Sequence, residues 1–127
     1  TFRNVHNWVQ AGTAPAMFHG FFAVLKPGGV LGVVDHRAAG TEAAADAGYL
    51  PVATVVALAR AAGFELEAES EINANPRDTH RHPKGVWTLP PTFALGDTDR
   101  ARYAAIGESD RMTLRFVKPA AQASTAP

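Results

Sequence analysis

Apolar side chains recur at helical spacing in residues 13–25 and again in residues 51–62. The first segment carries them at intervals of three and four residues, at Met17, Phe18, Phe21, Phe22 and Leu25. Thr13 can cap the first helix, and Gly63 stops the second. The pattern predicts two helices, each of which packs one apolar face against a core.

Two further segments predict strands. The run Val30–Val34 is apolar without alternation, which is typical of a strand covered on both faces. Residues 64–72 alternate instead, and their charged face, built from glutamates, favours an edge strand. The apolar face of this second strand is Phe64, Leu66, Ala68 and Ile72. With a helix between them, the two strands are expected to form a right-handed parallel crossover.

Residues 111–118 alternate as well and predict a last strand. Its inward face is Met112, Leu114 and Phe116. Arg115 faces outward, where we expect it to pair with the glutamates of the edge strand.

The connection formed by residues 73–110 contains four prolines and little periodicity. Connections of this length are usually functional or disordered, and the density of polar motifs favours function. Residues 119–127 have little to bury and are expected to form a disordered tail. We therefore expect one domain over residues 1–118.

Polar residues from four segments are expected to meet at one edge of the sheet. Ligands of open α/β sheets bind beyond the carboxyl ends of the strands. Residues 35–37 and 71–75 follow the two predicted parallel strands, and residues 108–111 join them if the last strand is antiparallel. Residues 3–8 lie there too, because they precede a helix that runs back along the sheet.

Five motifs stand out along the chain: Asn4–Trp8, Leu25–Leu31, Asp35–His36, Ala62–Phe64 and Asp110–Leu114. Together they resemble the second half of class I S-adenosylmethionine-dependent methyltransferases. The Leu-Lys-Pro-Gly-Gly turn at residues 25–29 is common across that superfamily. Residues 85–91 and 106–112 resemble a narrower group of bacterial predicted methyltransferases. The resemblance covers nearly all of residues 1–118.

The resemblance implies an α/β fold with a partial Rossmann-like methyltransferase sheet. In that superfamily the strand order is 3-2-1-4-5-7-6 with strand seven antiparallel, and this chain would supply strands 5, 6 and 7 with two helices. The N-terminal half, with the glycine-rich turn after strand one, is absent. Residues 27–32 do not replace that turn, because they precede a strand rather than follow one.

The activity that the resemblance implies is methyl transfer from S-adenosylmethionine to an unidentified small-molecule acceptor, with this chain supplying the acceptor-side half. The catalytic candidates are His36 and His6, since a neutral imidazole can accept a proton near pH 7. The expected cofactor contacts are Asn4, His6 and Asp35. The expected substrate contacts are Asn7, Arg37, Asn73, Trp87, Glu108, Asp110 and Arg111.

Each candidate also has a structural alternative. Asp35 and Arg37 could pair with His36 to order a loop, while His6 and the nearby asparagines could cap a helix or lie in the core. Residues 108–111 could form an ion-pair network that anchors the long connection.

The aromatic and histidine residues of the long connection have alternatives as well. Trp87, with the prolines after it, could wall an acceptor pocket or staple the connection to the sheet. His80 and His82 suggest a metal pair, but prolines flank them and no third ligand has suitable spacing, so we expect a solvated loop and no metal site.

Composition narrows the classes of function. The 127 residues carry 12 basic and 12 acidic side chains and no cysteine. The zero formal charge disfavours nucleic acid as a partner, and the lack of cysteine excludes disulfides and thiolate zinc sites. No apolar run approaches the roughly 18 to 20 residues of a membrane helix, so no membrane partner is expected. The compartment stays open between cytoplasm and periplasm.

Two other functions remain open at this point. Without strand four, the edge of strand 30–34 would be bare, and we expect two copies of the chain to associate there. A non-catalytic module that pairs through this edge is therefore the alternative to an enzyme. A weaker option is a metal-assisted hydrolase built on His36, His80 and His82.

Overall fold

The computed structural model describes residues 1–40 and 45–120. The helices in this part are α1 (Val5–Ala11), α2 (Ala14–Val24), α3 (Val52–Ala62) and α4 (Arg100–Ile106), with short 3-10 helices η1 (Ala45–Ala47) and η2 (Gly85–Thr88). The strands are β1 (Val30–His36), β2 (Glu65–Ser70) and β3 (Arg111–Val117). No described helix has the length and apolar character needed to cross a membrane. Of the expected tail, residues 121–127 lie outside the described part.

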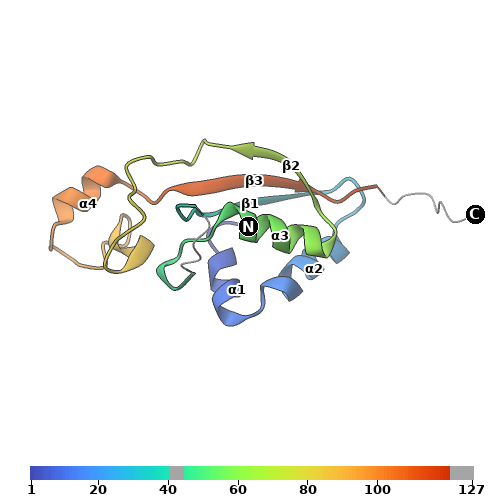
Figure 1. Cartoon of the computed structure of the whole chain (residues 1–127), viewed down its shortest axis with the longest axis horizontal. Coiled ribbons are helices and arrows are strands. Elements are labelled where there is room, and N and C mark those ends of the chain that lie inside the picture. Colours follow the sequence, from blue (N-terminus) through green and yellow to red (C-terminus); the bar gives the residue numbers. More distant parts are fainter. Residues whose placement is uncertain (41–44, 121–127) are drawn as a thin grey trace, which may run out of the picture.

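The three strands form one sheet in the order β1-β3-β2, with β3 antiparallel to both neighbours. The antiparallel direction of the last strand and the edge position of β2 are therefore confirmed. β1 and β2 run parallel to each other, but β3 lies between them, so α3 connects two strands that are not adjacent (Figure 1). The mixed α/β class is as expected.

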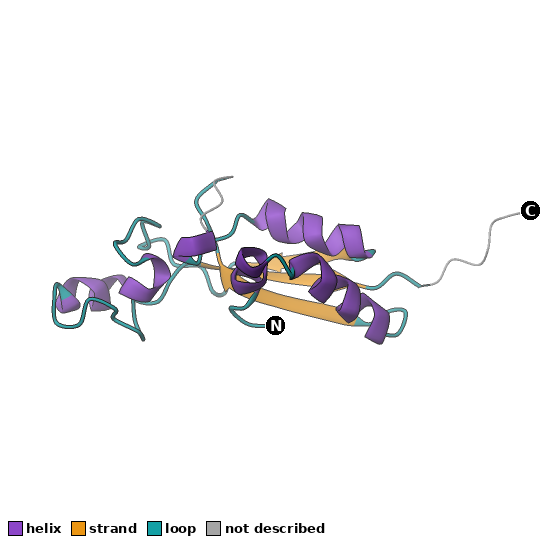
Figure 2. Ribbon diagram, turned by 90° about the horizontal axis from the view of Figure 1, so that it is seen from below, coloured by secondary structure: helices purple, strands orange, loops and turns teal. Residues whose placement is uncertain are grey.

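Helices α1, α2 and α3 all cover the same face of the sheet (Figure 2). Leu31 and Val33 of β1 point to that face and are buried, while Val30 is 41% exposed and Gly32 is exposed. The prediction that this strand is covered on both faces is wrong. Its apolar run fits a one-sided strand because glycine occupies one of the outer positions.

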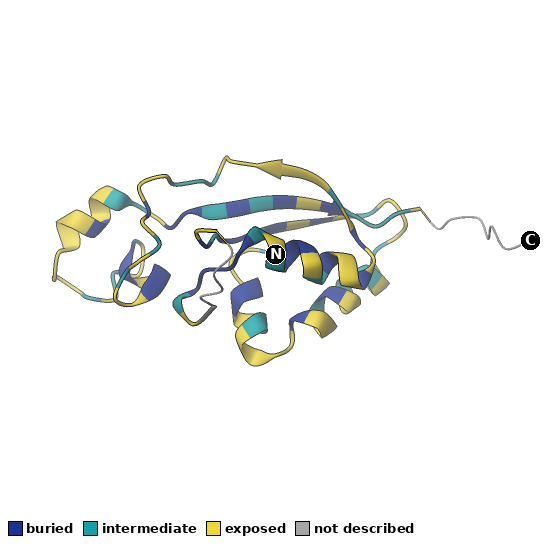
Figure 3. Cartoon of the chain, viewed as in Figure 1, coloured by how far each residue is buried: buried dark blue, intermediate teal, exposed yellow. Residues whose placement is uncertain are grey.

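The hydrophobic core lies between the sheet and these three helices (Figure 3). Phe18 of α2, Val55 of α3 and Phe116 of β3 are fully buried in it, which confirms the apolar faces of both predicted helices. Gly63 ends α3 with φ of 112°, and a Cβ there would lie 2.8 Å from the ring of Phe22. Only glycine fits this turn, because it must be both left-handed and close to an aromatic ring.

The alternation predicted for the edge strand holds only as far as Leu66. A register shift between Leu66 and Ala68 marks a β-bulge, after which Glu69 lies opposite Leu114. Because a bulge adds one residue, it exchanges the two faces of the strand. Ala68 is exposed and Ile72 is 81% exposed, so the prediction that they face the core is wrong.

The last strand follows its predicted pattern. Met112, Leu114 and Phe116 are buried, as expected for its inward face. On the outer face, Arg115 Nε lies 2.8 Å from Glu67 Oε1. The expected cross-strand ion pair is confirmed, and Glu67 reaches it from the bulge.

The prediction of two helices missed α1 and α4. Each has seven residues, so each gives about two turns and too short a window for a periodic pattern. α1 occupies residues that we expected to precede a helix. α4 lies in the long connection, and Figure 1 shows it beyond the end of the sheet, away from the three core helices.

Residues 1–3 cover part of the outer edge of β1. Phe2 forms a parallel bridge with Val34, whose carbonyl accepts a hydrogen bond of 2.6 Å from the Arg3 backbone N–H. The amino group of Thr1 donates to the carbonyl of Gly32 at 2.7 Å. The prediction of a bare edge is therefore wrong beside Gly32 and Val34, and association of two copies through β1 stays a prediction for its Val30 end.

Candidate functional site

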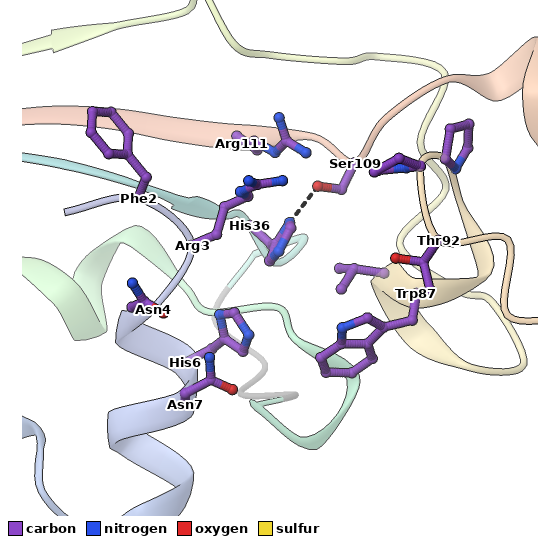
Figure 4. A pocket seen from close by; sticks show the side chains of 13 residues that line it. Phe2, Arg3, Asn4, His6, Asn7, His36, Trp87, Thr92, Ser109 and Arg111 are labelled. Carbon is purple, nitrogen blue, oxygen red and sulfur yellow. Dashed lines mark hydrogen bonds between the residues drawn. The ribbon is translucent and has the colours of Figure 1, made fainter.

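A pocket of about 300 Å³ opens beside the end of β1 (Figure 4). Its walls come from the start of the chain with α1, from the end of β1, from η2 with the prolines after it, and from the residues around the start of β3. We call this cavity the polar pocket. The residues that line it are Phe2, Arg3, Asn4, His6, Asn7, His36, Val86, Trp87, Pro90, Pro91, Thr92, Ser109 and Arg111.

A buried carboxylate holds the first histidine of the pocket. Asp35 is fully buried, and its Oδ1 lies 2.8 Å from His6 Nδ1. The same carboxylate accepts the backbone N–H groups of His6 and His36, each at 2.8 Å. Since a carboxylate only accepts hydrogen bonds, the neutral His6 ring carries its proton on Nδ1, and in that form Nε2 has the free lone pair.

The second histidine is held by a hydroxyl. His36 Nδ1 and Ser109 Oγ form a buried hydrogen bond between the end of β1 and the residues before β3. Burial, which penalises the charged imidazole, lowers the pKa of His36 to about 4. The Asp35 carboxylate opposes this shift, while the neighbouring His6, Arg111 and Arg3 add to it. His36 is therefore neutral at pH 7.

The aromatic ring of Trp87 lies beside the two histidines of the pocket. The ring centroids of His6 and His36 lie 5.1 Å apart, and those of His6 and Trp87 lie 6.0 Å apart with an edge-on orientation. Gly85 makes this placement possible: its φ is 58°, and a Cβ there would lie 2.2 Å from the carbonyl oxygen of Ala47. The close approach of η2 to η1 thus sets where Trp87 stands.

Six of the sequence-predicted site residues meet in this pocket. They are Asn4, His6, Asn7, His36, Trp87 and Arg111. Asn4 is the N-cap residue of α1 but makes no side-chain capping bond, so the capping alternative does not apply to it. The expected proline wall after Trp87 is also present, as Pro90 and Pro91 line the cavity.

Asp35, the expected cofactor contact, lies beneath the pocket rather than on its wall. Its oxygens are occupied by His6 and by the backbone of His36, and it is fully buried. Its place in the structure is that of a group that orients both histidines.

Four expected substrate contacts lie outside the pocket. Arg37 binds both oxygens of Asp110, at 3.0 and 2.9 Å, and also pairs with Glu71. These bonds raise the pKa of Arg37 above its usual value. Asn73 donates to Thr113 Oγ1 at 2.7 Å, and Glu108 lies on the surface as a partner of Arg111. Arg37 and Asp110 thus form the ion-pair network that was the structural alternative for this stretch.

The prediction of a solvated loop at His80 and His82 is wrong, because both histidines belong to the same network and the His82 side chain is only 3% exposed. His80 Nε2 lies 3.0 Å from Asp110 Oδ2, and His82 Nε2 lies 2.8 Å from Asp78 Oδ1. Neither residue lines the polar pocket, so they are not brought to His36 as a metal site would need. The group with metal-type ligands that the described residues do form is His6, Asp35 and His36, whose ligand atoms lie within 4.8 Å of one another.

Sequence reasoning did not single out Arg3, Ser109, Thr92 or Phe2, which also line the pocket. Arg3 and Ser109 belong to the polar segments that we expected at the sheet edge, and this placement could have predicted them as pocket residues. Thr92 and Phe2 gave no signal, because a lone residue of either type is common on any surface.

The chain is similar in structure to a solved protein, but it matches no family model and no curated sequence. Among solved structures, the chain resembles one titled "Crystal Structure of the [4+2]-Cyclase SpnF", with a TM-score of 0.49 and 23% sequence identity. The likeness covers 84% of this chain and 45% of that one, so this chain spans less than half of that protein.

Proposed function

We propose that this chain is the acceptor-side half of an S-adenosylmethionine-dependent methyltransferase and that the polar pocket binds a small-molecule methyl acceptor. The observation that carries the proposal is that His6, on the wall of a cavity at the end of β1, is held by the buried Asp35 beneath it. The motif resemblance supplies the reaction class. The strand order β1-β3-β2 supports it, because it is the order expected for strands 5, 7 and 6.

His6 serves as the general base in this proposal. Asp35 fixes the Nδ1 proton and compensates the positive charge that develops on the ring, so Nε2 can take a proton from the acceptor. His36 suits this task less well, because a group with a pKa of about 4 is a weak base at neutral pH. A neutral His36 instead acts as a hydrogen-bonding group that, with Ser109, orients the acceptor.

The residues present fit one side of the cofactor. β1 and β2 are not followed by a tight glycine-rich turn that opens a helix, which is the element that would hold the adenosine part. Asn4 and His6, which line the polar pocket, would hold the methyl-bearing end of the cofactor in this proposal. When bound, S-adenosylmethionine supplies an electrophilic methyl group, and the protein's part is to position the acceptor and remove its proton.

The proposal is tested by binding and by turnover. S-adenosylhomocysteine is titrated calorimetrically into this chain and into the chain extended upstream of Thr1 by its natural coding sequence. Methyl-labelled S-adenosylmethionine is then incubated with each protein and a panel of phenols, amines and thiols. We expect saturable binding and labelled product with the extended chain.

The variant His6→Gln then tests whether His6 is the general base. We expect it to lower turnover by about 10²- to 10⁴-fold, the usual contribution of a positioned base, while S-adenosylhomocysteine still binds. His19→Gln is the matched control, because His19 is an exposed histidine on α2. An extended chain that folds but does not bind S-adenosylhomocysteine would overturn the proposal and favour the non-catalytic module.

A further inference from the structure

One end of the polar pocket is positively charged. Arg3 and Arg111 both line it, and Figure 4 shows their guanidinium groups on the same side as Ser109 and His36. Both arginines also act on His36, where their charge contributes to the lowered pKa. The positive charge of the two guanidinium groups therefore acts inside the cavity as well as at its rim.

These two arginines are less fully paired than Arg37 and Arg115. Arg37 is held by Asp110 and Glu71, and Arg115 by Glu67. Arg3 has no side-chain hydrogen bond or ion pair within residues 1–40 and 45–120. Arg111 reaches only Glu108, an exposed side chain, at 3.2 Å.

Arg111 also carries a polar atom with no partner. Its Nε is buried and makes no hydrogen bond within the described part of the chain. A buried donor without an acceptor is unfavourable, and a carboxylate is the group that guanidinium binds with the best geometry. The covered Nε is not itself open to a ligand, but the incompletely paired guanidinium of Arg111 on the pocket wall favours an anionic group of a ligand at this end of the cavity.

The same charges argue against a metal ion at His6, Asp35 and His36. The Asp35 carboxylate already accepts three hydrogen bonds, from the backbone N–H and ring Nδ1 of His6 and from the backbone N–H of His36. A divalent cation would also meet the positive field of the two arginines. The positive charge of Arg3 and Arg111 therefore favours an anion over a cation in the polar pocket.

Apolar side chains complete the lining of the pocket. Val86, Trp87, Pro90 and Pro91 come from η2 and the residues after it, whereas Phe2 lies on the side of Arg3 and Arg111 (Figure 4). Phe2 is 71% exposed and Trp87 37% exposed, so both rings have surface to cover. A cavity of about 300 Å³ is at the small end of the range for small-molecule sites. An aromatic ring fits such a wall by stacking and edge contacts.

We infer that the polar pocket takes an aromatic carboxylate, with its carboxylate at Arg3 and Arg111 and its ring against Trp87 and Pro90–Pro91. A hydroxyl on that ring, at the end away from the carboxylate, would lie at His6 as the methyl acceptor. This last step rests on the proposed function. The anion site itself does not.

The test uses a charged probe and its neutral counterpart. 4-Hydroxybenzoate and 4-hydroxybenzamide are titrated separately into the whole chain, without cofactor, and binding is followed by calorimetry. The variants are Arg111→Gln and Arg3→Gln. The control is Arg115→Gln, which makes the same change on the same strand, β3, at a residue paired with Glu67 outside the pocket.

We expect 4-hydroxybenzoate to bind and the benzamide to bind at least about tenfold more weakly, since a charge-assisted bond is lost. Each pocket variant should weaken benzoate binding about tenfold or more, and Arg115→Gln should leave it unchanged. Arg3→Gln keeps the test valid if Arg111→Gln does not fold. Equal binding of the two probes, or no effect of either pocket variant, would overturn the inference.

A second titration separates this inference from the proposed function. If the two arginine variants weaken S-adenosylhomocysteine and leave 4-hydroxybenzoate unchanged, the carboxylate site belongs to the cofactor and the acceptor assignment is wrong. If the benzoate binds as expected while the extended chain neither binds S-adenosylhomocysteine nor transfers methyl groups, the anion site stands and the methyltransferase proposal fails.

Discussion

Two polar clusters lie beyond the end of the sheet, and they differ in how many of their polar atoms are hydrogen-bonded. In the first, which we call the anchoring network, Asp78 accepts hydrogen bonds from the Tyr49 hydroxyl, the His82 ring and the backbone N–H groups of His80 and Asp110, at 2.8 to 3.0 Å. In the polar pocket, His6 and His36 each engage one ring nitrogen and leave Nε2 without a partner among the described residues.

The titration behaviour of the two clusters follows from this difference. Burial alone would raise the pKa of Asp78, but its donors outweigh burial and lower that pKa below its usual value. In the pocket, burial outweighs the opposing Asp35 carboxylate at His36 and lowers its pKa to about 4. A fully satisfied cluster stabilises the fold, whereas a cluster with open atoms facing a cavity is available to a ligand.

The largest effect is expected when a carboxylate of the anchoring network is changed. Asp78→Asn leaves donors from Tyr49 and His82 without a charged acceptor in a buried site, so we expect a loss of about 3 to 5 kcal/mol in the free energy of unfolding. Urea denaturation at pH 7 measures it. Asp97→Asn makes the same change at an exposed residue and should cost almost nothing. Equal effects of the two variants would remove the distinction between the clusters.

The next effect is the pH dependence contributed by the pocket. His36 takes up its proton at pH about 4 when folded and near 6.5 when unfolded, so the unfolded state binds more protons between these values. Stability is therefore fully present above pH 6.5 and falls by about 3 kcal/mol as the pH drops to 4.

The dependence of stability on pH can be assigned to His36 with a variant and a control. In His36→Gln, the part of the loss between pH 6.5 and 4 that belongs to His36 should disappear from urea-denaturation curves, while the exposed His19→Gln keeps it. The lowered pKa values of Asp78 and Asp110 act in a different range: their stabilisation is present above about pH 3.8 and is lost below it. A slope that survives in His36→Gln would contradict the assignment of a buried, neutral imidazole.

The smallest effect is expected at the hydroxyl between the clusters. Ser109→Ala removes one hydrogen bond to His36 beside a cavity, where water can replace it, so we expect about 1 kcal/mol. Ser70→Ala, at an exposed position of β2, is the control in the same denaturation experiment. A cost for Ser109→Ala as large as that of Asp78→Asn would mean that the pocket, too, is mainly structural.

Local pattern predicted the elements that bury one regular face. α2 and α3 appeared as expected, since their apolar residues recur at helical spacing, and β3 kept its alternation. The pattern failed for β2, where a bulge after Leu66 exchanged its faces. A bulge is set by pairing with the neighbouring strand, and residues 64–72 alone contain no sign of it.

The candidate site was predicted as a place more than as a set of residues. The carboxyl end of β1 was expected to gather polar segments, and His6, His36, Trp87 and Arg111 do meet there. Arg37 and Asp110 were expected at the same place, but they bind each other across 73 positions of sequence. Which polar residues face a cavity and which pair among themselves depends on side-chain distances that no spacing rule supplies.

The sequence by itself determined the mixed α/β class, the edge at which polar residues gather and the neutral overall charge. These follow from hydrophobic periodicity and composition, which act over a few residues at a time. The tertiary structure decided that α1, α2 and α3 cover one face only, that Asp35 orients His6, and that the Arg111 Nε lies buried without a partner among the described residues. Those features depend on contacts between segments far apart in the chain, where burial sets what each polar atom must bind.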